Sequence, residues 1–219
     1  MPRRVPDHLP PGAVIRGRGV ASRPAGRFAR AETVPEAADD DLPGPAPETE
    51  LITEKIRTII SRNQSPDIPF GQSVNPYRGC EHGCVYCYAR PSHAYLDLSP
   101  GLDFEQKIFT KPEAATVLRR ELSKPGYDCR PIALGANTDA WQPVERDLRI
   151  TRQILEVLAE FRHPVNIITK SALVERDLDL LEDLARDNLV GVLVSVTTLD
   201  DELKRRMEPR TAGPRRRLE

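Results

Sequence analysis

The chain contains the stretch Gly79-Cys-Glu-His-Gly-Cys-Val-Tyr-Cys-Tyr88, in which three cysteines fall within eight residues. We interpret Cys80, Cys84 and Cys87 as three thiolate ligands of one metal centre. The number of ligands is informative, because a four-iron cluster held by only three cysteines keeps one iron open to another molecule. The stretch therefore predicts a metal centre at which chemistry can take place.

Other roles for clustered cysteines fit less well. The chain has four cysteines in 219 residues and no apolar N-terminal stretch typical of a signal peptide, which favours a reduced, cytoplasmic setting over disulfides. Structural zinc prefers two pairs of ligands, whereas here the spacing is x3 then x2 and no second pair follows. His82, His93 or Cys129 could still supply a fourth ligand, so zinc remains open on spacing alone. The C-x2-C-x2-C spacing of ferredoxins does not match.

The wider segment from Asn75 to His93 resembles the radical S-adenosylmethionine (radical SAM) superfamily. In that superfamily the C-x3-C-x2-C loop has an aromatic residue just before the third cysteine, as Tyr86 is here. The Tyr86-Cys87-Tyr88 triplet looks like the spore photoproduct lyase-like branch, which is also described as DNA repair photolyase-related. The resemblance covers about residues 50 to 219 and weakens the zinc alternative.

The resemblance implies both cofactors and a reaction. Members of the superfamily hold a 4Fe-4S cluster on the three cysteines, and S-adenosyl-L-methionine (SAM) chelates the open iron. An external electron donor of the flavodoxin or ferredoxin type reduces the cluster, and SAM is cleaved to methionine and a 5'-deoxyadenosyl radical that abstracts hydrogen from a substrate. The chain is therefore expected to be a radical SAM enzyme, with its substrate unassigned.

Composition is compatible with this interpretation but does not select it. The net charge of -1 provides no overall field for nucleic acid or lipid, and a hydrophobic content of 39% can fill a core. No run approaches the roughly 18 apolar residues that span a bilayer. We expect a soluble protein with no membrane partner.

The N-terminal part differs from the rest of the chain. Residues 1–30 carry seven arginines and one acid, residues 31–50 carry seven acids and no base, and nine of the 21 prolines precede residue 50. These features predict a disordered Pro/Arg/Gly-rich tail over residues 1–49. The run Arg16 to Arg27 could contact phosphates, although a solvated tail is the simpler interpretation. A rival hypothesis follows, in which the chain is a non-catalytic iron-sulfur or zinc module, or an inactive fragment, that binds nucleic acid.

Helical and strand patterns begin after residue 50. The isoleucine spacing in 51–62 predicts a helix, and 72–77 predicts a strand that ends just before the cysteines. A long loop through Gly101 follows. The stretch 110–113 is typical of a capping box, and it predicts a helix that continues to about Ser123.

The remainder repeats one unit, a short apolar run followed by an amphipathic helix. This alternation indicates a parallel sheet covered by helices. The predicted elements are strands at 131–136, 165–169 and 190–196 and helices at 148–161 and about 174–184. We assign the chain to the α/β class, and residues 50–219 to the N-terminal part of a radical SAM core. By resemblance this core is a partial TIM-type (β/α) barrel, here truncated after about four βα units.

Loops that follow parallel strands open on one face, so polar residues at the ends of these strands should converge on the cysteines. Lys170 is suited to the SAM carboxylate, and Thr138 and Asp139 to its ammonium or ribose hydroxyls. Tyr86 and Tyr88 offer aromatic surface for the adenine.

The resemblance to spore photoproduct lyase places Thr138, Lys170 and Ser195 at the methionine moiety or the ribose. It also matches Arg210, in Met207-Glu-Pro-Arg-Thr211, to a recurrent motif after the fourth strand. Taken alone, Lys170 could end a strand in solvent and Ser195 could be a small packed residue. Their joint placement at strand ends is what favours a cofactor site.

Two departures from that branch limit what can be transferred. Spore photoproduct lyases return hydrogen from a cysteine near the end of the second strand, and Leu134-Gly-Ala-Asn137 contains none. Cys129 comes before that strand and is interpreted as an ordinary thiol, so thymine-dimer repair is not predicted and no residue is assigned a catalytic role. A sheet of about four strands is also expected to leave an unpaired edge, with poor solubility or easy proteolysis.

Overall fold

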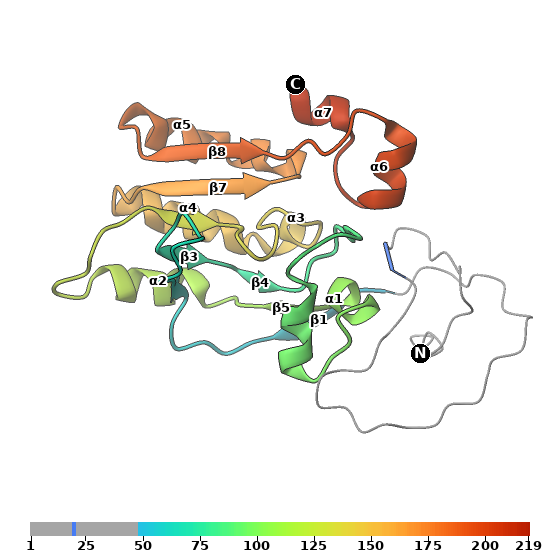
Figure 1. Cartoon of the computed structure of the whole chain (residues 1–219). Helices are drawn as coiled ribbons and strands as arrows, with labels where there is room; N and C mark the ends of the chain where they lie inside the picture. Colours follow the sequence, from blue (N-terminus) through green and yellow to red (C-terminus); the bar gives the residue numbers. More distant parts are fainter. Residues whose placement is uncertain (1–18, 21–47) are drawn as a thin grey trace, which may run out of the picture.

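The computed structural model describes residues 19–20 and 48–219, and these residues form two β-sheets flanked by helices (Figure 1). The larger sheet has the strand order β2-β3-β6-β7-β8, and the smaller has the order β1-β5-β4. The strands are β1 (Glu50–Thr53), β2 (Ile60–Arg62), β3 (Gln72–Val74), β4 (Tyr77–Arg78), β5 (Lys107–Thr110), β6 (Ile132–Leu134), β7 (Val165–Thr169) and β8 (Val190–Val194). The α-helices are α1 (Leu102–Gln106), α2 (Ala114–Leu122), α3 (Glu145–Leu148), α4 (Ile150–Glu160), α5 (Leu178–Arg186), α6 (Asp201–Met207) and α7 (Pro214–Leu218), and the 3-10 helices are η1 (Arg90–Leu96) and η2 (Ala172–Asp177).

The parallel sheet expected from the apolar runs is present. Strands β3, β6, β7 and β8 are parallel neighbours, and β2 joins the edge of β3 in the antiparallel direction. The register aligns Val74 with Leu134, Leu134 with Ile167, and Ile167 with Val192. The α/β class and the parallel order are thus confirmed, whereas closure into a partial barrel stays a prediction.

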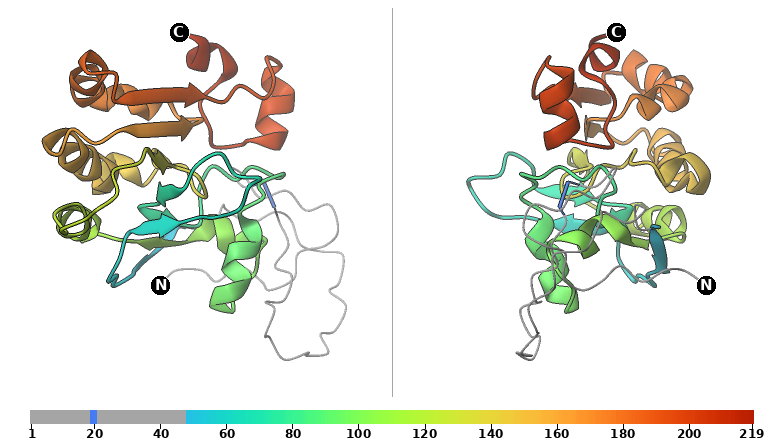
Figure 2. Two further views of the ribbon diagram at one scale, coloured as in Figure 1. Left: turned by 60° about the vertical axis from the view of Figure 1, so that its left-hand side comes forward. Right: turned by 90° about the vertical axis from the view of Figure 1, so that its right-hand side faces the viewer.

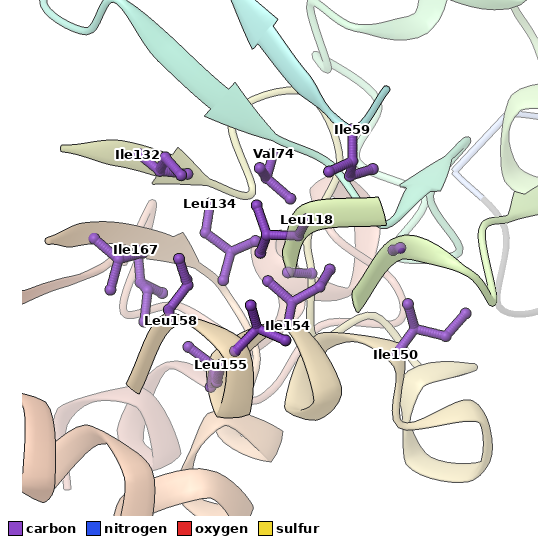
Figure 3. Close-up of a cluster of buried hydrophobic side chains, with 14 of the residues drawn as sticks. Ile59, Val74, Leu118, Ile132, Leu134, Ile150, Ile154, Leu155, Leu158 and Ile167 are labelled. Atoms are coloured by element: carbon purple, nitrogen blue, oxygen red, sulfur yellow. The ribbon is translucent and has the colours of Figure 1, made fainter. Parts of the chain in front are cut away.

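Helices α2, α4 and α5 lie side by side along one face of the larger sheet (Figure 2). Their apolar residues meet those of the strands in one continuous core, where Leu118 of α2 and Ile154 of α4 lie near Val74 and Leu134 (Figure 3). Burial of these aliphatic side chains is the main force that holds the helices on the sheet. The helix predicted after the 110–113 stretch to about Ser123 and those at 148–161 and 174–184 are confirmed within a few residues, the last as η2 followed by α5.

The predicted strand at 72–77 is divided in two. Proline has no N–H to donate to a sheet, and Pro76 separates β3 from β4. After this break the chain leaves the larger sheet, and β4 pairs with β5 of the smaller one. The cysteines follow β4 directly and therefore lie on the connection from β4 to β5 of the smaller sheet.

The helix predicted over 51–62 is wrong. Residues 50–53 form β1, which pairs with β5, and residues 60–62 form β2, which pairs with β3. Six of the ten residues in 51–60 are β-branched, which disfavours a helix. Buried Glu121 of α2 also accepts hydrogen bonds from the backbone N–H groups of Ile59 and Ile60, and these groups would be used internally in a helix.

Two further local expectations are corrected. The loop through Gly101 contains η1, and α1 and β5 follow it directly. Thr110 belongs to β5 rather than to a capping box, and α2 begins after Glu113 with no side-chain cap. Residues 107–110 form β5 because they pair with β1 and β4 of the smaller sheet. Local residue spacing does not reveal such long-range pairing.

The predicted disordered tail, residues 1–49, lies outside the described residues except for 19–20 and 48–49. Of these, Gly19 donates its backbone N–H to Glu105, and the hydroxyl of Thr49 donates to Glu81. In the part of the chain that the structure describes, no helix is long and apolar enough to cross a membrane.

Candidate metal centre

The three cysteines lie on one loop between β4 and η1. None forms a disulfide; Cys80 is buried and Cys84 and Cys87 are partly buried. The fourth cysteine, Cys129, is exposed and precedes β6, so it lies towards the edge where the strands begin, away from the loop. The structure thus separates one thiol from the other three.

Cys80 is fixed through the backbone on both of its sides. Its own N–H donates to the carbonyl oxygen of Phe104 over 2.9 Å. The side-chain amide of Gln142 accepts from the N–H of Glu81 over 2.9 Å and donates to the carbonyl oxygen of Gly79 over 3.1 Å. Gly79 has a φ of +81°, and a Cβ there would lie 2.8 Å from the carbonyl oxygen of Phe104, so this position requires glycine.

Cys84 is held by a different side chain. The guanidinium of Arg90 donates to the carbonyl oxygen of Cys84 over 2.8 and 3.1 Å and to that of Gly101 over 3.0 Å. Arg90 also forms an ion pair with Glu105, and both residues are buried. Cys87 completes a local turn by donating its N–H to the carbonyl oxygen of Cys84 over 3.3 Å.

Asp139 joins the ends of β6 and β7 to the cysteine loop. Its carboxylate accepts from the N–H of Lys170 over 2.7 Å, from the hydroxyl of Thr169 over 2.8 Å and from the N–H of Trp141 over 2.9 Å. The ring Nδ1 of His82 lies 3.4 Å from the same carboxylate. Burial alone would raise the pKa of Asp139, but interaction with His82 and these hydrogen bonds hold it below its usual value.

Lys170 and Tyr86 lie together beside Cys84. The ammonium of Lys170 is 5.9 Å from the centre of the Tyr86 ring, within the range of a cation–π interaction. Among the described residues, no side chain or carbonyl accepts a hydrogen bond from Lys170 Nζ. Burial raises the pKa of the Cys84 thiol to about 12, and the positive charge of Lys170 acts in the opposite direction.

The remaining predicted residues are at the same edge. The Thr138 hydroxyl donates to the carbonyl oxygen of Tyr77 over 3.2 Å, and the Tyr88 hydroxyl donates to that of Ala136. Ser195 directly follows β8, and its backbone N–H donates to Thr169 over 2.9 Å. Arg210 donates its N–H to the carbonyl oxygen of His82 over 3.2 Å.

The segment 207–210 contacts the cysteine loop along its length. The carbonyl oxygen of Met207 accepts from the N–H of Val85 over 3.0 Å, and the Tyr86 hydroxyl donates to the carboxylate of Glu208. Arg210 pairs with Glu81 over 3.1 Å. The segment at the C-terminal end of α6 therefore packs against the cysteine loop.

A comparison with family models matches residues 74–219 to the radical SAM superfamily. This match covers more than half of the chain and includes all three cysteines and every residue named at the strand ends. The chain belongs to the radical SAM superfamily. Members of this superfamily are generally enzymes, and they typically use a 4Fe-4S cluster, SAM and an electron donor.

The curated relatives of this radical SAM chain carry no assigned function. An uncharacterized protein of Mycobacterium tuberculosis is 43% identical over 151 residues, which are 69% of this chain and 44% of that protein. Uncharacterized proteins of Methanocaldococcus jannaschii and of Acidianus two-tailed virus are 26% and 28% identical, over 78% and 75% of this chain and 60% and 55% of their own lengths. The chain thus spans about half the length of the curated relatives it matches. No solved structure matches.

Three thiols on one loop are the donor set that the four-iron cluster of this superfamily typically uses. Within residues 19–20 and 48–219, no three His, Cys, Asp or Glu side chains are grouped so as to hold one metal ion. A four-iron cluster does not need such a group, because its three thiolates bind three different irons. The histidines considered for zinc have other contacts, since His82 faces Asp139 and His93 Nε2 lies 3.0 Å from the carbonyl oxygen of Lys107.

Sequence reasoning did not find three buried polar residues at this site, Glu81, Gln142 and Glu208. Glu81 and Glu208 lie next to residues that were singled out, within the cysteine loop and beside Arg210. Nothing in the local pattern marks Gln142, because its two hydrogen-bond partners lie more than sixty residues away in the sequence.

Proposed function

We propose that the chain is a radical SAM enzyme of the spore photoproduct lyase-like branch, with a 4Fe-4S cluster on Cys80, Cys84 and Cys87. One observation carries this proposal. The three cysteines occupy one loop at the edge where β6 and β7 end, and Lys170 lies beside Cys84 there with no hydrogen-bond acceptor or carboxylate partner for its ammonium among the described residues. When bound, the reduced cluster and SAM would supply a 5'-deoxyadenosyl radical for hydrogen abstraction.

The polar residues divide into two proposed roles. Lys170 is available to bind the SAM carboxylate, and Tyr86 and Tyr88 are partly exposed or exposed, so they can present aromatic surface to the adenine. Thr138 and Asp139 already donate to or accept from protein groups. We propose that Thr138 and Asp139, together with Ser195 and Arg210, shape the cofactor site. They would contact SAM through the donor and acceptor atoms that do not already bind protein groups.

The proposal also includes domain bounds, an electron donor and a cellular compartment. We assign residues 50–219 to the N-terminal part of a partial barrel, served by an external flavodoxin- or ferredoxin-type donor in a reducing cytoplasm. The Arg/Gly run of the rival nucleic-acid hypothesis lies outside the described residues apart from Gly19 and Val20. No contact of those residues supports a nucleic-acid partner, and thymine-dimer repair is not part of the proposal.

The test is anaerobic reconstitution of the whole chain with iron and sulfide, followed by dithionite and SAM. We expect about four irons per chain, with the broad visible absorbance of a cluster, and formation of 5'-deoxyadenosine. Cys84→Ala should lose both. Cys129→Ala is the matched control, since it removes an exposed cysteine outside the loop and should leave iron content and product unchanged.

One zinc per chain with no iron absorbance would contradict the proposal. Iron binding without 5'-deoxyadenosine would favour the non-catalytic module instead. Because the chain spans about half the length of its relatives, a full-length relative should be assayed in parallel.

A further inference from the structure

Gln142 is a buried residue that contacts the cysteine loop without being one of its cysteines. Its side chain is fully buried, at 0% exposure, in the turn between β6 and α3. The amide oxygen accepts from the N–H of Glu81, and the amide nitrogen donates to the carbonyl oxygen of Gly79. One side chain thus binds the peptide groups on both sides of Cys80.

The position of Gln142 is itself strongly determined. Its N–H donates to the carbonyl oxygen of Asp139 over 3.3 Å, and its carbonyl oxygen accepts from Glu145 over 2.9 Å. The preceding residue, Trp141, is fully buried, and its indole N–H donates to Asp177 over 2.8 Å. The amide is therefore held on a rigid turn rather than on a mobile loop.

The chemistry of an amide suits this double contact. A side-chain amide carries an acceptor and a donor on one planar group, so it can bind an N–H and a carbonyl oxygen together. Glutamate would present an oxygen to the carbonyl of Gly79, and asparagine is one methylene shorter. Burial also makes each lost hydrogen bond costly, because no water replaces it.

Cys80 lies outside the part of the loop that Arg90 holds. Cys84 and Cys87 belong to one local turn, and Arg90 fixes it. Among the described residues, Arg90 donates hydrogen bonds to Cys84, Gly101 and Glu105 and to none of residues 79–81, so it does not hold the backbone around Cys80.

We propose that Gln142 is a positioning residue for Cys80, one that holds the backbone of residues 79–81 so that the Cys80 sulfur is in place before any cluster binds. This inference rests on the proposed function for its meaning, but its main consequence concerns the apo-protein. Without Gln142, the Cys80 thiol should react faster with an added reagent, whereas the reaction rates of Cys84 and Cys87 should change less.

The first experiment measures alkylation of each cysteine in the metal-free chain under native conditions, with iodoacetamide and peptide mass spectrometry. In Gln142→Ala we expect Cys80 to react about tenfold faster than in the unmodified chain, because two buried hydrogen bonds no longer oppose local opening. Gln142→Met, which keeps most of the volume without the hydrogen bonds, should show the same acceleration.

Gln72→Ala is the matched control. Gln72 is also buried, and its amide likewise makes a donor and an acceptor contact, with Asp128 and Tyr127, away from the cysteine loop. A merely structural role for Gln142 predicts similar Cys80 reactivity in both variants at equal thermal stability. The proposal predicts a selective effect of Gln142, and an unchanged Cys80 rate in both Gln142 variants would overturn it.

The second experiment compares iron content and the electron paramagnetic resonance spectrum of the reduced, reconstituted chain. Gln142→Met should bind less iron or give a shifted spectrum, whereas Gln72→Ala should match the unmodified chain. An unchanged iron content and spectrum in Gln142→Met would overturn the proposal. If the unmodified chain binds no iron, the proposed function fails, and the alkylation result still decides whether Gln142 positions Cys80.

Discussion

Arg90 combines a buried charge with a structural contact to one of the three cysteines. Its guanidinium donates to Cys84 and Gly101 and faces the carboxylate of Glu105, which is 0% exposed. A planar fork of donors can serve all three acceptors at once, which a lysine ammonium cannot do in the same geometry. At the scale of single residues, the loop therefore depends on Arg90 for Cys84 as it depends on Gln142 for Cys80.

Replacing Arg90 with alanine is expected to lower the free energy of unfolding by about 3 kcal/mol, because a buried carboxylate loses the cation that faces it. Arg90→Lys should lower the free energy of unfolding by less, since the positive charge stays and only the planar set of guanidinium donors is lost. Urea denaturation of the apo-protein measures both effects. Arg119→Ala is the control, because its pair with Glu160 is about half exposed on both sides and should contribute much less to stability.

Lys170→Met is expected to weaken SAM binding to the reconstituted chain about 10- to 100-fold, the usual loss for one charge-assisted hydrogen bond. Lys170→Arg should retain part of the affinity. Isothermal titration calorimetry with SAM measures the dissociation constants, and Lys124→Met, which alters an exposed lysine, serves as the control. Equal affinity in Lys170→Met and the unmodified chain would contradict the proposed role.

At the scale of elements, a buried ionic network joins η2, α3 and the turn after β6. Asp177 accepts from the indole of Trp141 and pairs with Arg176 and Arg152, and Arg176 also pairs with Glu145. Burial would raise the pKa of Asp177, but the hydrogen bonds from Arg176, Trp141 and Arg152 outweigh it and lower the pKa. The network supports the turn that carries Gln142.

This shift has a defined consequence for acid stability. Because the pKa of Asp177 is lower in the folded than in the unfolded chain, its stabilisation is complete above the ordinary value of 3.8 and is lost as the pH falls through the folded-state value. Asp177→Asn should therefore be less stable than the unmodified chain at pH 6, and the difference should shrink towards pH 2. The free energy of unfolding of both chains, measured at steps of about one pH unit from pH 6 to pH 2, gives this difference. A difference that stays constant with pH would show that Asp177 is not the titrating group.

How much local pattern predicts depends on the kind of element. The strands β6, β7 and β8 and the helices α2, α4 and α5 were predicted, since short apolar runs and amphipathic repeats reflect burial on a sheet. The region 51–62 was not, because its isoleucines fit a helical spacing while pairing with β5 and β3 makes it two strands. Tertiary pairing overrides local spacing in such short segments.

At the scale of the whole molecule, β8 is an exposed edge of the larger sheet. Val192, Leu193 and Val194 are 42%, 56% and 41% exposed, although they lie in a β-strand that alternates faces. An edge strand with apolar side chains on both faces is a template for pairing with another chain.

We therefore expect concentration-dependent self-association that Leu193→Lys reduces, because a charge on an edge strand opposes strand addition. Light scattering over a range of protein concentrations measures this. Leu178→Lys is the control, since Leu178 is 48% exposed at the start of α5 rather than on the edge strand. A chain that remains monomeric at every concentration would contradict the prediction.

The sequence by itself determined the three-cysteine loop and the parallel order of the strands that end beside it. Both are local properties, since the three cysteines lie within eight residues and each predicted strand is one apolar run. Only the tertiary structure decided what holds the cysteines. Glu81 and Arg210 are 129 residues apart in the chain, and Gln142, Arg90 and Glu208 owe their roles to buried partners. Such partners are chosen by the need to satisfy every buried polar group, which is a property of the packed fold and not of any short stretch of sequence.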